Sequence, residues 1–74
     1  MKLYVVYDQP RDYPESYVVR GFQITTEGPV PDPAPLAVVA ELVEARRAIL
    51  EAAPGSVRVE RYPHDDPMLV EVWL

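Results

Sequence analysis

The residues best suited to chemistry are His64, Asp65 and Asp66, which stand together between Pro63 and Pro67. A histidine beside two carboxylates can bind a divalent metal ion or act as a general base. Metal sites usually need about three or four converging ligands, however, and Asp and Pro are also ordinary turn formers. The sequence therefore favours a structural turn over residues 63–67, with a metal or acid–base site and a recognition site as the two alternatives.

A second group that could do chemistry consists of arginines. Arginine binds carboxylate and phosphate groups bidentately, and an anion site could be built from Arg20, Arg46, Arg58 and Arg61. Pairing with carboxylates of neighbouring strands is the favoured alternative, because the chain has twelve acidic residues and only seven basic ones. The resulting net charge of −5 also argues against nucleic acid as a partner, since such binders usually carry a basic patch.

Aromatic residues form a third group, and the five tyrosines with Trp73 could offer a stacking surface for bases. The acidic charge favours packing in a core or an interface instead. The sequence contains no recognisable nucleophile motif and no glycine-rich phosphate loop. With no cysteine and one histidine, neither a disulfide nor a closed zinc site is expected, and no cofactor is predicted. The sequence thus favours a protein that is not an enzyme.

The elements that must position these residues are four strands and one helix. Alternating apolar residues predict strands over residues 2–8, 17–25, 57–62 and 68–74. Pro35 suits a first helical position and Pro54-Gly55 suits a helix end, so a helix is predicted over residues 36–53. Residues 26–35 carry prolines at alternate positions, and we interpret them as a stiff crossover rather than a ligand for an aromatic groove. The order ββαββ predicts an α+β fold in one domain, residues 1–74: a mainly antiparallel four-stranded sheet with one helix on one face.

Two positions carry sharper expectations. Gly21 lies in the middle of the second predicted strand, which indicates a bulge or the close approach of another side chain. Arg46 falls inside the apolar arc of the predicted helix, so its guanidinium must be paired or must reach the rim. The leading carboxylate partners for Arg46 are Glu71, Asp65 and Asp66.

One helix can cover only one face of a sheet, yet the predicted strands place apolar side chains on both faces. The uncovered face is expected to show several of Tyr4, Tyr7, Tyr17, Val19, Leu69 and Trp73. Exposed apolar area of that size usually means a partner, and a homodimer is the simplest one. The chain has no signal-peptide pattern and no run of about 18 apolar residues, which predicts a cytoplasmic protein that does not cross a membrane. Its apolar C-terminal strand, which runs to Leu74, predicts that the chain is complete.

Several short stretches together resemble a family of small uncharacterised bacterial and phage-borne proteins. The stretches are Tyr13-Pro14, YVVRGF at 17–22, LVEAR at 42–46, Pro63 with DDP at 65–67, and VEVW at 70–73. The resemblance covers most of the chain and implies membership but no activity. The ββα arrangement is also similar to HicB-like antitoxin domains, without their Pro-Gly-Cys-type motif or DNA-binding extension.

Three functions follow as expectations. The first is a self-associating interaction module that is not an enzyme. The second is an antitoxin-like regulatory domain that binds a protein partner. The third is a small metal-dependent or acid–base enzyme that uses His64, Asp65 and Asp66.

Overall fold

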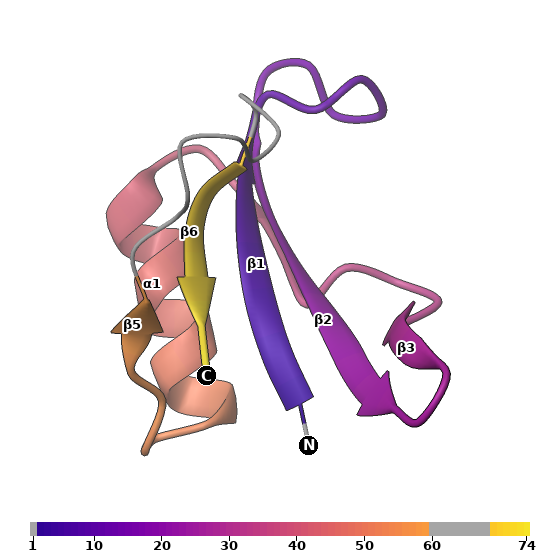
Figure 1. Cartoon of the computed structure of the whole chain (residues 1–74). Coiled ribbons are helices and arrows are strands. Elements are labelled where there is room, and N and C mark those ends of the chain that lie inside the picture. Colours follow the sequence, from indigo (N-terminus) through magenta and orange to yellow (C-terminus); the bar gives the residue numbers. More distant parts are fainter. Residues whose placement is uncertain (1, 60–68) are drawn as a thin grey trace.

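The computed structural model describes residues 2–59 and 69–74. Its six strands form one sheet, in which every pair of neighbours is antiparallel, and one helix packs against that sheet (Figure 1). The α+β class is therefore confirmed. The elements, in chain order, are β1 (Lys2–Asp8), β2 (Tyr17–Thr25), β3 (Gly28–Pro31), β4 (Ala37–Val39), α1 (Leu42–Ala52), β5 (Arg58–Val59) and β6 (Leu69–Trp73).

The strand order is β3-β2-β1-β6-β5, and β4 also pairs with β2. The central strand β1 pairs along its whole length with β2, from Lys2↔Gln23 to Asp8↔Tyr17. On its other side β1 pairs with β6, with a register shift between Val6 and Tyr7. The last strand of the chain thus lies inside the sheet, between β1 and β5 (Figure 1).

The predicted count of four strands is wrong, because residues 26–40 add two short strands to the free edge of β2. Pro31 lies opposite Phe22 in β3, and Val39 lies opposite Tyr17 in β4. Between these strands, the N–H of Asp32 donates to the carbonyl of Gly21. Backbone N–H groups point alternately toward and away from the neighbouring strand. The nitrogens of residues 29, 31 and 33 therefore point away from β2. All three residues are prolines, and their missing N–H groups cost no hydrogen bond to β2.

The helix begins at Leu42 rather than at residue 36, which corrects the prediction. Val38 and Val39 fit the apolar arc of a helical wheel, but both are β-branched and they pair with β2 instead. Glu41 is the N-cap residue, in an extended conformation. The helix ends at Ala52, close to the predicted end.

The core lies between α1 and the face of the sheet that α1 covers. It is formed by Tyr4, Val6, Val19, Ala45, Ile49 and Trp73. Beside it, the register through Gly21 is unbroken, so the close-approach interpretation of this glycine is confirmed. A Cβ at Gly21 would lie 2.5 Å from Oδ2 of Asp32 and 2.8 Å from Cε of Lys2. The Lys2–Asp32 ion pair therefore crosses the sheet at a place where only glycine leaves room.

Candidate functional site

The residues singled out from the sequence do not form one group. Arg46 and Trp73 lie close together on the helix-covered side of the sheet, where they contact the same carboxylate. Arg20 lies on the opposite face, in register with Val5 of β1. The turn residues His64, Asp65 and Asp66, and also Arg61, lie outside the described residues. The structure therefore separates Arg20 from any anion site that includes Arg46.

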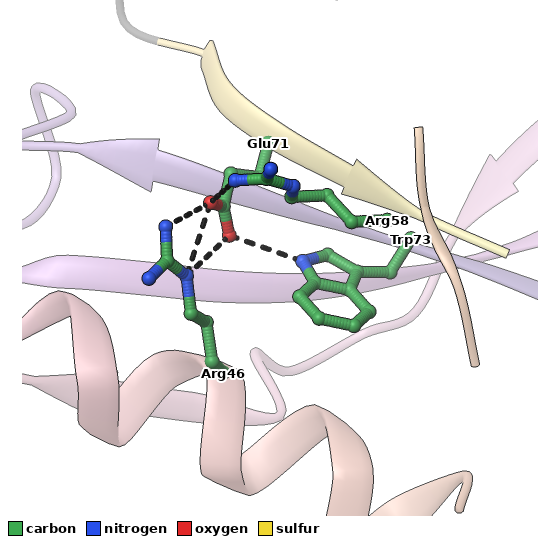
Figure 2. Close-up of polar contacts among 4 residues, drawn as sticks. All are labelled: Arg46, Arg58, Glu71 and Trp73. Carbon is green, nitrogen blue, oxygen red and sulfur yellow. Dashed lines mark hydrogen bonds and ion pairs between the residues drawn. The ribbon is translucent and has the colours of Figure 1, made fainter. Parts of the chain in front are cut away.

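Glu71 of β6 is the centre of a charged network, and its side chain is only 5% exposed. Arg46 reaches it from α1, donating from Nε to both carboxylate oxygens at 3.1 Å and from Nη2 to Oε2. Arg58 of β5 donates from Nη1 to Oε2 at 3.2 Å. The indole Nε1 of Trp73 donates to Oε1 at 3.1 Å (Figure 2). The carboxylate partner expected for Arg46 is confirmed, and it is Glu71.

Strand alternation and register explain how the network assembles. Glu71 and Trp73 are two residues apart in β6, so their side chains share the helix-covered face. Arg58 is the cross-strand partner of Trp73, which places it on that same face. Arg46 follows the buried Ala45 on α1 and lies at the rim, 40% exposed. The pairing of Arg58 with a carboxylate of a neighbouring strand is confirmed. The hydrogen bond from Trp73 to the same carboxylate was not predicted.

The network keeps Glu71 ionised. Burial alone would raise the pKa of this carboxyl, but the hydrogen bonds from Arg46, Trp73 and Arg58, together with the charge of Arg46, outweigh burial and lower the pKa. The same hydrogen bond and charge raise the pKa of Arg46. Both carboxylate oxygens of Glu71 accept hydrogen bonds. This arrangement suits a structural link between α1, β5 and β6 better than general-base catalysis or metal binding. Among residues 2–59 and 69–74, no group of three or more metal-ligating side chains occurs.

The opposite face of the sheet differs sharply from this charged network, and we call it the open sheet face because α1 lies against the other side (Figure 1). Strand register assigns to it the side chains of Leu3, Val5, Tyr7, Val18, Arg20, Phe22, Ile24, Val38, Val59 and Val72. Nine of these ten are apolar or aromatic. Val5 and Val18 are buried, at 6% and 1% exposure, whereas Val38 and Val59 near the two edges are 41% and 37% exposed.

Arg20 is the single charged member of the open sheet face, and its charge is paired within the chain. Its Nη2 lies 3.7 Å from a carboxylate oxygen of Asp12, in the loop between β1 and β2. Its Nη1 donates to the backbone carbonyl of Asp32 at 3.4 Å. The face is thus broad, largely apolar and nearly free of unpaired charge, which makes it the best candidate for an interaction surface.

No family model matches this chain, and no curated protein and no solved structure is significantly similar to it. The resemblance to the phage-borne family and to antitoxin domains therefore stays a prediction. None of the helices in the described part of the chain is long and apolar enough to cross a membrane. The function must accordingly be argued from the open sheet face and the charged network.

Proposed function

We propose that this protein is a non-enzymatic interaction module that associates with a second copy of itself. The observation that carries the proposal is the open sheet face, where nine of ten assigned side chains are apolar or aromatic. Val38 and Val59 of this face are 41% and 37% exposed, and an exposed apolar patch often marks an interaction site. Association would remove this surface from water, and the hydrophobic effect would supply the driving force.

The size of the chain supports the same proposal. A domain of this length buries only about 60% of the surface of its unfolded chain, so its stability as a monomer is modest. Small domains commonly gain stability from disulfides, metals or oligomerisation. This chain has no cysteine, and α1 covers one face of its sheet. A second copy would provide the cover that the open sheet face lacks.

The charged network supports a role outside catalysis. Glu71 is buried, ionised and held by donors from three elements, so it joins α1 to β5 and β6. A rigid helix–sheet unit of this kind is a suitable platform for an interaction surface on its other side. The cytoplasmic location and the absence of a cofactor remain predictions.

Sedimentation velocity of the wild-type chain at several micromolar concentrations tests the proposal. We expect a species of twice the monomer mass that dissociates on dilution, because a modest apolar interface gives a reversible dimer. A monomer at every concentration would contradict self-association. That result would leave the alternative of a regulatory domain with a different protein partner.

A further inference from the structure

The way in which two copies meet can be inferred from the edges and faces of the sheet. We propose that they pack open sheet face against open sheet face, which gives a dimer of four layers: helix, sheet, sheet, helix. This inference rests on the proposed self-association and adds the surface that mediates it. Its basis is the poor fit of the β3–β4 edge for strand pairing, the area of the open sheet face and the pairing of the one charge on that face.

The β3–β4 edge is a poor template for pairing with another sheet. Because Asp32 donates inward to Gly21, the backbone nitrogens of residues 29, 31 and 33 point outward. All three residues are prolines, which have no N–H to donate. Prolines on an outer strand are a common device against edge-to-edge association.

The open sheet face is large enough for a specific dimer. The six strands contain 7, 9, 4, 3, 2 and 5 residues, 30 in all. At standard strand spacing and rise each residue covers about 16 Å², which gives about 490 Å² per copy. Two such faces together would bury about 980 Å², close to the roughly 1,000 Å² of a small biological interface.

The chemistry of the open sheet face selects a second copy as its occupant. Arg20 is neutralised by Asp12 and bound by the carbonyl of Asp32, so the face offers no unpaired charge to an acidic peptide or a phosphate backbone. A matching partner must be equally apolar and must leave the Arg20–Asp12 pair undisturbed. The same face of another copy meets both conditions, and pairing identical patches about a two-fold axis closes the assembly at two.

A pair of matched substitutions tests this geometry. Val38 in β4 lies on the open sheet face and is 41% exposed, whereas Val30 in β3 lies on the opposite side of the sheet and is 50% exposed. Both belong to the same outer edge, and Val38→Lys and Val30→Lys add the same charge. In a face-to-face dimer Val38→Lys buries two ammonium groups, so we expect its dissociation constant to rise about tenfold or more. Val30→Lys should dimerise as the wild type does.

Sedimentation velocity of the full chain and both variants gives the readout, with circular dichroism to show that each variant is folded. Val59→Lys, near the other edge of the open sheet face and 37% exposed, should also weaken the dimer and serves if Val38→Lys does not fold. If the folded open-face variants dimerise like the wild type, or if Val30→Lys weakens the dimer equally, the face-to-face geometry is wrong while self-association stands. A wild-type chain that is monomeric throughout would overturn both.

Discussion

A chain that lacks its last four residues, Glu71 to Leu74, is expected to lose cooperative folding altogether. These residues form most of β6, which lies between β1 and β5, so their removal splits the sheet. Trp73 is a core residue at 8% exposure, and deleting a buried tryptophan side chain costs about 3–5 kcal/mol. A domain of this size has only about 3–5 kcal/mol to lose. The loss of Glu71 also leaves Arg46 and Arg58 without their carboxylate.

Thermal melting followed by circular dichroism measures this effect. Leu74→Ala is the matched control, because Leu74 is 45% exposed and its truncation should lower the melting temperature only slightly. Trp73→Ala should reproduce most of the damage with the chain length unchanged. A truncated chain that melts cooperatively near the wild-type temperature would show that these residues are a detachable tail, contrary to the structure.

Arg46→Ala is expected to lower the free energy of unfolding several-fold more than Arg47→Ala does, because it removes a donor from a buried carboxylate. The substitution leaves Glu71, which is 5% exposed, with only Arg58 and Trp73 as donors. The loss should fall short of that for a wholly buried pair, because Arg46 itself is 40% exposed and water screens its charge. Arg47→Ala is the matched control: Arg47 is the next residue of α1 and is exposed, so its removal should cost less than about 0.5 kcal/mol.

Urea denaturation of both variants at neutral and acid pH tests this prediction. The pKa of Glu71 is lower in the folded chain than in the unfolded one, so the network stabilises the fold above about pH 4.3 and loses its effect as the pH falls through the lowered pKa. The difference between wild type and Arg46→Ala should therefore shrink in acid. Equally small losses of unfolding free energy for Arg46→Ala and Arg47→Ala would mean that the Arg46 guanidinium is solvated and does not stabilise the fold.

Local sequence patterns predicted the elements whose residues fit only one type of secondary structure. β1 and β2 have the predicted bounds, because aromatic and β-branched residues alternate through both and turn residues lie between them. The helical wheel located Arg46 inside the apolar arc and so predicted its carboxylate partner. Alternation also predicted apolar side chains on both faces of the sheet, but it assigned several residues wrongly to the uncovered face. Tyr4, Val19 and Trp73 were expected there and lie in the core against α1 instead.

The parts that were missed depend on contacts between distant residues. Val38 and Val39 satisfy a helical pattern and a strand pattern equally well, and only their pairing with β2 decides for a strand. Pro29 and Pro31 argue against a strand unless their nitrogens point away from the sheet, which the sequence alone does not reveal. Likewise, Arg58 and Trp73 meet at one carboxylate because of the β5–β6 register, and no local pattern indicates that convergence.

In the proposed dimer, the open sheet face of one copy is covered by the same face of a second copy. The most direct measurement is an isotope-filtered NOE experiment on a dimer mixed from labelled and unlabelled chains, since it records only contacts between copies. In a face-to-face dimer, such contacts are expected for methyl groups of Val38, Val59 and Val72. Contacts between copies that arise instead from Val43 and Leu50, the exposed apolar residues of α1, would contradict it.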